Sequence, residues 1–147
     1  MGFAFRFESL LSYRAHQKER AQIALARARK RLQEAKDALA ALDSERREVS
    51  EALTKVKHNP VESEILRGYV DYLGALEIKI QAGENEVKSR AHEVQIALQE
   101  VLEKTRAHSI MEKLKEKDYE AWLSESRHRE QKMQDETAVL RHGRADL

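Results

Sequence analysis

Apolar and small side chains recur at alternating steps of three and four positions through both halves of the chain. In the first half only Arg46 interrupts the series, and in the second half the phase changes once, between Gly83 and Ala91. A heptad pattern kept over so many turns predicts a coiled coil rather than an ordinary amphipathic helix. The first series is Phe7, Leu11, Ala21, Leu25, Ala28, Leu32, Ala35, Leu39, Leu42, Val49, Leu53 and Val56. The second series is Leu66, Tyr69, Leu73, Leu76, Ile80, Gly83, Val87, Ala91, Val94, Leu98, Val101 and Thr105.

One strong break separates the two series. Asn59 can cap a helix, and Pro60 suits the first helical position, where a missing N–H costs nothing. We therefore expect a first helix over about 4–56, a loop over 57–59 and a second helix over about 60–139. Because so short a connection makes the helices antiparallel neighbours, we predict an all-α fold. It is a long antiparallel two-helix coiled coil, or helical hairpin, whose second helix overhangs the first.

Residues 1–147 are expected to form a single coiled-coil domain with a definite pairing of the two helices. In this pairing Leu42 meets the Leu73–Leu76 region, and the N-terminal phenylalanines pack near residues 104–114. Trp122 then lies beyond the first helix. Since tryptophan is rarely left in water, we expect self-association or a partner protein to cover it.

The composition supports long helices and argues against a multi-layer core. Charged residues make up 36% of the chain and aromatic residues 5%, with 27 Lys and Arg against 26 Asp and Glu. The absence of cysteine excludes disulfides and thiolate metal sites and fits a reducing cytoplasm. No apolar run approaches the roughly 20 residues that a membrane helix needs, so the protein is not expected to span a membrane.

Signatures of catalysis are missing from the sequence. There is no glycine-rich phosphate loop, no G-x-S-x-G and no H-E-x-x-H, and the six histidines show no pairing at helical spacing. A two-helix hairpin also offers no deep cleft that could shift the pKa of a carboxylate. We therefore expect a protein that is not an enzyme and that uses no metal or other cofactor.

A basic stretch from Arg14 to Lys36 has two interpretations. It could bind nucleic acid, or it could form ion pairs with glutamates across the hairpin and so fix the register. The second is favoured because no aromatic residues for base stacking are interleaved with the cations. Nucleic acid is therefore not expected as a partner. The glutamates are Glu84, Glu86, Glu93, Glu100 and Glu103.

Residues 65–80 carry an apolar arc that is wider than one partner helix can cover. Ile65, Tyr69 and Tyr72 adjoin the seam, which widens the arc to roughly 160°, against the roughly 100° of a single buried face. This is either a partly exposed edge or a surface that binds another protein, and tyrosines beside leucines suit the second role.

Four short motifs lie at the start, middle and end of the chain. They are Phe3-x-Phe5-x-Phe7-Glu8-x-Leu10-Leu11-x-Tyr13-Arg14, Glu19-Arg20-Ala21-Gln22-x-Ala24-Leu25-Ala26, Tyr69-x-x-Tyr72-Leu73-x-x-Leu76-Glu77 and Arg129-Glu130-Gln131-Lys132-x-x-Asp135-Glu136. In this order, and with the loop position and the long second helix, the sequence resembles the FliJ family of bacterial flagellar export proteins over nearly its whole length.

The resemblance implies a stalk in the flagellar type III export apparatus, cytoplasmic and peripheral to the inner membrane at the flagellar basal body. Such a stalk inserts its termini into the ring of the hexameric export ATPase and promotes its assembly and activity. It also contacts the cytoplasmic domain of the membrane export gate and the export chaperones. The residues implied to contact the ring are Phe5, Leu10, Leu11, Tyr13, Arg14, Arg129, Gln131, Lys132 and Glu136. Those implied to contact the gate are Leu42, Tyr72 and Leu76.

Two further interpretations remain open at the level of sequence. One is a coiled-coil stalk subunit of an injectisome or of a rotary ATPase, which the flanking genes would distinguish from a flagellar stalk. The other is a helical hairpin that binds nucleic acid, for which a steep dependence of affinity on salt would be the evidence.

Overall fold

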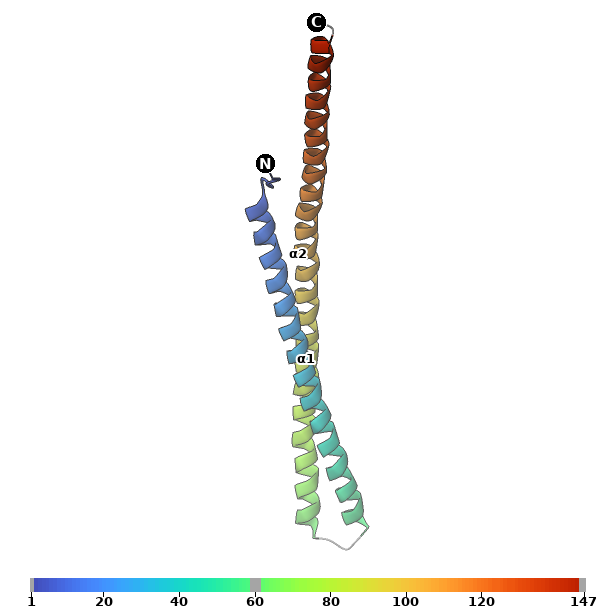
Figure 1. The fold of residues 1–147 in the computed structure, drawn as a ribbon. Coiled ribbons are helices and arrows are strands. Elements are labelled where there is room, and N and C mark those ends of the chain that lie inside the picture. Colours follow the sequence, from blue (N-terminus) through green and yellow to red (C-terminus); the bar gives the residue numbers. More distant parts are fainter. Residues whose placement is uncertain (1, 59–61, 146–147) are drawn as a thin grey trace. The chain divides into compact units, whose positions relative to one another are not determined.

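The computed structural model describes residues 2–58 and 62–145, and it contains two long helices, α1 (Glu8–Lys57) and α2 (Ser63–Ala145) (Figure 1). No strand occurs in these ranges, and the predicted two-helix fold is confirmed. The predicted cap at Asn59 and Pro60 lies outside the described residues. α1 begins later than the expected position 4 and includes Lys57, whereas α2 continues past the expected end at 139.

The helices form two compact units. We call residues 20–102 the loop unit and residues 1–19 with 103–147 the terminal unit. Each unit contains one segment of α1 beside one antiparallel segment of α2.

The loop unit is held together by the predicted heptad seam. The side chains of Leu76 and Ile80 on α2 are only 2% and 4% exposed, so α1 covers them almost completely. Burial of such side chains is the main stabilising contribution available to a two-helix hairpin. The buried seam residues of α1 in this unit are Ala21, Leu25, Ala28 and Leu53.

The pairing of the helices in the loop unit differs from the predicted one. Leu42 lies against Gly83, further along α2 than the expected Leu73–Leu76 region. The late start of α2, at Ser63, explains the shift, because each residue added to the connection moves the opposing position further along the second helix.

Gly83 marks a close approach of the two helices. A methyl group placed on its Cα would lie 3.2 Å from Leu39 Cδ1, which is tighter than ordinary van der Waals contact. The sequence pattern calls for a larger side chain here, but the space is already filled from α1.

Two of the glutamates expected to pair with the basic stretch have another partner in the structure. Glu86 and Glu93 both pair with Arg90 on their own helix, at 2.8 and 3.1 Å. Across the loop unit, Arg46 pairs with Glu77 at 3.4 Å. Register is therefore set mainly by the apolar seam and not by these charges.

The terminal unit contains an aromatic cluster that sequence reasoning placed differently. The ring of Phe3 lies 5.2 Å from that of Tyr119, edge to face, and 6.0 Å from that of Trp122. The expected contact near residues 104–114 is therefore wrong for Phe3, and Trp122 is partly covered by the chain's own N-terminus. Residues 2–5 are not helical, and an extended segment advances more than 3 Å per residue against 1.5 Å in a helix, so Phe3 reaches further along α2.

Beyond this cluster α2 continues alone. Every side chain from Arg127 to Arg144 is exposed, and we call this segment the overhang. Figure 1 shows it, in the red part of the ribbon, extending past the first turn of α1. Neither helix contains, within the described residues, a stretch that is long and apolar enough to cross a membrane.

Candidate functional site

The N-terminal residues implied to contact the ATPase ring lie on the first turns of α1 and just before it. Phe5 is buried, whereas Leu10 and Tyr13 are 38% and 56% exposed. The Gln17 side-chain amide nitrogen donates to the Tyr13 hydroxyl at 2.9 Å, and the Arg14 guanidinium donates to the Gln17 side-chain oxygen, Oε1, at 3.5 Å. Tyr13 and Arg14 are thus held in one small network on the surface of α1.

Phe5 has a supporting role in this arrangement. Its ring lies 5.9 Å from that of Phe7, and its carbonyl oxygen accepts a hydrogen bond from the amide of Glu8 at 3.3 Å, where α1 begins. The Glu8 carboxylate in turn pairs with Lys115 on α2 at 3.0 Å. Of these contacts, the Glu8–Lys115 ion pair joins the start of α1 to α2.

The C-terminal residues implied to contact the ring all belong to the overhang. Arg129, Gln131, Lys132 and Glu136 are exposed, and Arg129 pairs with Glu125 one turn earlier, at 3.0 Å. In the described residues no hydrogen bond, ion pair or aromatic contact joins them to the N-terminal set. The structure therefore places the two sets in one unit without bringing them together.

A shallow apolar hollow lies between the N-terminal segment and α2, and sequence reasoning did not identify it. Phe3 and Leu11 form one side, and Tyr119 with the charged Glu112 and Lys115 forms the other. The sequence feature that points to this hollow is the run of alternating phenylalanines. The heptad pattern could not show which residues of α2 they contact.

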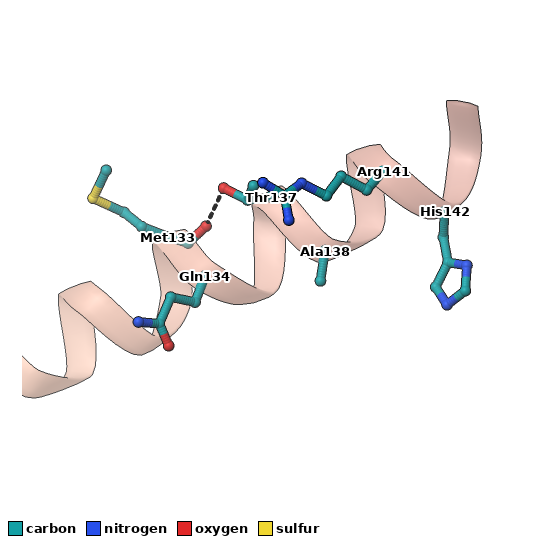
Figure 2. Close-up of a pocket in the computed structure, with 6 residues that line it drawn as sticks. All are labelled: Met133, Gln134, Thr137, Ala138, Arg141 and His142. Atoms are coloured by element: carbon teal, nitrogen blue, oxygen red, sulfur yellow. Dashed lines mark hydrogen bonds between the residues drawn. The ribbon is translucent and has the colours of Figure 1, made fainter. Parts of the chain in front are cut away.

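A second hollow lies on the overhang itself. Figure 2 shows that all its lining residues come from one helix and that the Thr137 hydroxyl donates to the carbonyl oxygen of Met133, at 2.8 Å. Because no other element among the described residues lines it, it is an open depression between neighbouring side chains rather than an enclosed site. Its lining residues are Met133, Gln134, Thr137, Ala138, Arg141 and His142.

The three residues implied to contact the export gate belong to the loop unit but differ greatly in exposure. Tyr72 is 46% exposed, Leu42 is half-buried, and Leu76 is the most deeply buried large side chain among the described residues. Tyr72 and Leu76 are one turn apart on α2, so the buried leucine lies beside the base of the exposed tyrosine.

The Tyr72 hydroxyl donates a hydrogen bond across the hairpin to the carboxylate of Glu45. This bond raises the pKa of Tyr72 above its ordinary value of 10.0, and partial desolvation and the negative charge of Glu45 act in the same direction. The bond orients an exposed aromatic side chain at the surface.

Beside Tyr72 runs a shallow, mostly apolar groove. It is lined by Val49 of α1 and by Ile65, Gly68, Tyr69 and Tyr72 of α2. Gly68 leaves the groove open, because a methyl group at that position would meet nothing within 4 Å. The wide apolar arc predicted Ile65, Tyr69 and Tyr72, whereas Val49 and Gly68 were not recognised as part of this surface.

Comparisons with known proteins add a family and a fold. The family model described as "Flagellar FliJ protein" matches residues 3–147. Among solved structures, a putative YscO homolog from Chlamydia trachomatis superposes with a TM-score of 0.65 at 20% sequence identity, covering 96% of each chain. At this identity the likeness concerns the fold alone. None of the curated proteins compared with the chain matches it.

Proposed function

We propose that this chain, which belongs to the FliJ family of flagellar proteins, is a non-enzymatic stalk of the flagellar type III export apparatus. It inserts its terminal unit into the ring of the hexameric export ATPase and promotes the assembly and activity of the ring. It also connects the ring to the cytoplasmic domain of the export gate and to export chaperones, at the cytoplasmic face of the inner membrane.

The observation that supports ring insertion is the construction of the terminal unit. The contacts of Phe3 with Tyr119 and Trp122 hold the N-terminal segment against α2, and the exposed Glu8–Lys115 ion pair also joins the start of α1 to α2. Beyond them the overhang offers a single helix, about 10–12 Å across, with exposed charged side chains on all sides. Its width and its free surface suit a narrow pore lined by polar groups.

A stalk of this shape can act without chemistry. A single helix has no rotational symmetry, so it contacts the six subunits of a ring differently and makes them inequivalent. If it binds one nucleotide state of a subunit more tightly than another, it shifts the populations of those states by the difference in binding free energy.

For the gate, we propose that Tyr72 and the groove beside it form the contact surface. Leu76 is covered by α1 and supports Tyr72 from beneath, and Leu42 lies at the same helix interface. The hydrogen bond to Glu45 orients the tyrosine before a partner arrives, which lowers the entropy lost on binding.

Ring insertion is tested by the ATP hydrolysis rate of the export ATPase from the same organism, with and without this protein. Two fourfold alanine variants are compared, and each removes two cations, one carboxylate and one glutamine from the exposed overhang. The test variant replaces Arg129, Gln131, Lys132 and Glu136. The control replaces Arg127, Glu130, Gln134 and Arg141, most of which lie on another side of the helix.

We expect the wild-type protein and the control to stimulate hydrolysis and the test variant to lose the stimulation. Equal stimulation by both variants would contradict the assigned contacts. Absence of any stimulation or co-migration with the wild-type protein would contradict ring insertion itself.

Gate binding is tested by calorimetric titration of the cytoplasmic domain of the gate with Tyr72→Ala. Val70→Ala is the matched control, because Val70 is 57% exposed on the same helix but points away from Tyr72. We expect Tyr72→Ala to weaken binding about tenfold or more, as truncation of an interface aromatic does. Unchanged affinity would remove this surface from the proposal.

A further inference from the structure

A stripe of basic side chains runs along the outer side of α1 in the loop unit. Arg20, Arg27, Lys30 and Arg31 follow one another at helical spacing, and all are exposed. Ile23, 46% exposed, lies among them at the same spacing. We call these five residues the basic stripe. The buried seam residues of this segment face the other side of the helix, so the basic stripe plays no part in holding the hairpin together.

The cations of the basic stripe are not neutralised within the part of the chain that the structure describes. Arg20, Arg27, Lys30 and Arg31 make no hydrogen bond or ion pair there. The first carboxylate that follows them in the sequence, Glu34, is exposed and likewise forms no ion pair. Four uncompensated positive charges on one rigid helix therefore face the solvent and attract an anionic partner.

We propose that the basic stripe binds the anionic phospholipid headgroups of a membrane surface. The four cations lie within about three turns of a straight helix, roughly 16 Å long, so all can approach one flat layer of phosphates together. Ile23 suits this partner, because an apolar side chain among cations can enter the boundary between headgroups and acyl chains.

The same observations argue against nucleic acid as the occupant. Residues 20–36 contain no aromatic side chain on which a base could stack. A phosphate backbone also offers no apolar surface against which the exposed side chain of Ile23 could pack.

The expected strength is modest. Each basic side chain held at an anionic membrane surface strengthens binding by roughly fivefold, so four together contribute several hundredfold at low salt. The proposal rests on the proposed function, because the gate contact keeps the basic stripe near the membrane and raises its effective concentration there.

The test uses the purified full-length protein and sedimentation of vesicles, without ATPase or gate. Vesicles of phosphatidylcholine with about 30% phosphatidylglycerol are compared with pure phosphatidylcholine, at roughly 0.05 M and 0.3 M salt. The test variant changes the four cations of the basic stripe to glutamine. The control changes Lys55, Arg67, Lys79 and Lys88 to glutamine, which alters the net charge equally at exposed positions of the same unit.

We expect wild-type protein and control to sediment with the anionic vesicles at low salt only, and the test variant to bind at least about fiftyfold more weakly. A second arm measures binding to a labelled single-stranded oligonucleotide. Equal loss in both variants, binding to neutral vesicles, or loss of oligonucleotide binding with vesicle binding intact would each overturn the proposal. Because the assay contains no ATPase or gate, its failure is distinct from failure of the stalk function.

Discussion

Replacing Leu76 with alanine tests how much of the hairpin depends on a single seam position. The Leu76 side chain is 2% exposed, so α1 covers nearly all of it. Removing it takes away the burial of three carbon atoms and leaves a cavity that two packed helices can close only in part. Both effects act on the free energy of unfolding.

Leu→Ala substitutions at buried positions cost about 2–5 kcal/mol. The seam of a two-helix hairpin can relax more easily than the interior of a globular domain, so we expect about 3 kcal/mol for Leu76→Ala. With an m-value of about 2 kcal/mol/M, the midpoint of unfolding in urea then falls by about 1.5 M.

The assay is urea unfolding followed by circular dichroism at the helical minimum, with Ile78→Ala as the control. Ile78 is two positions away on α2 but 75% exposed, so its loss should cost less than about 0.5 kcal/mol. A similar shift in the two variants would refute the assignment of Leu76 to the seam. The result also determines how Leu76→Ala can be used in gate-binding experiments, since lost affinity could come from lost folding.

Three further predictions concern other contacts. Phe3→Ala should uncover Trp122, shifting its fluorescence emission to longer wavelength and lowering stability by about 1 kcal/mol in thermal unfolding. Glu45→Gln should return the pKa of Tyr72 toward its ordinary value of 10.0, as measured by absorbance titration of the phenolate. Gly83→Leu should overfill the helix interface and cost about 1–3 kcal/mol in urea unfolding.

Each of these has a clear contrary outcome. An unchanged emission maximum in Phe3→Ala would mean that the N-terminus does not cover the tryptophan. The pKa of Tyr72 is raised in the folded protein. The stabilisation that the Tyr72–Glu45 hydrogen bond gives to the folded state is therefore complete below pH 10.0 and is lost as the pH rises through the folded-state pKa. An unchanged titration curve in Glu45→Gln would contradict the hydrogen bond, and full stability of Gly83→Leu would contradict the close approach of the helices.

The heptad pattern was sufficient to predict the fold because every seam position requires the same thing, an apolar or small side chain that the other helix buries. Leu25, Ala28 and Ile80 are buried as their spacing requires. The pattern could not give the pairing of the helices, since a shift along a regular seam still matches apolar positions with apolar positions. Gly83 illustrates this, because its small size makes sense only once the opposing leucine is known.

The candidate surfaces were predictable only in part. Exposure of Tyr72 followed from an apolar arc too wide for one partner helix. The heptad series already placed Leu76 in the buried seam, and only the family resemblance assigned it to the gate contact. The contact of Phe3 with α2 depends on a non-helical segment, whose reach no helical periodicity describes. Glu86 and Glu93 pair with Arg90 of their own helix and not with the basic stretch, because exposed pairs contribute too little free energy to dictate geometry.

The overhang has a thermodynamic consequence. Since no described residue covers the side chains of residues 127–144, their helical state depends on local backbone hydrogen bonds and on ion pairs such as Arg129–Glu125. Most helical stability in proteins comes from packing against a partner, so these amides should exchange with deuterium far sooner than those near Leu76. When a partner encloses the overhang, the segment must become fully helical. Part of the binding free energy is therefore used to order it. The intrinsic helix propensity of these residues therefore contributes to the affinity for the partner. A substitution to alanine should raise that affinity and one to glycine should lower it, even at a position that does not contact the partner.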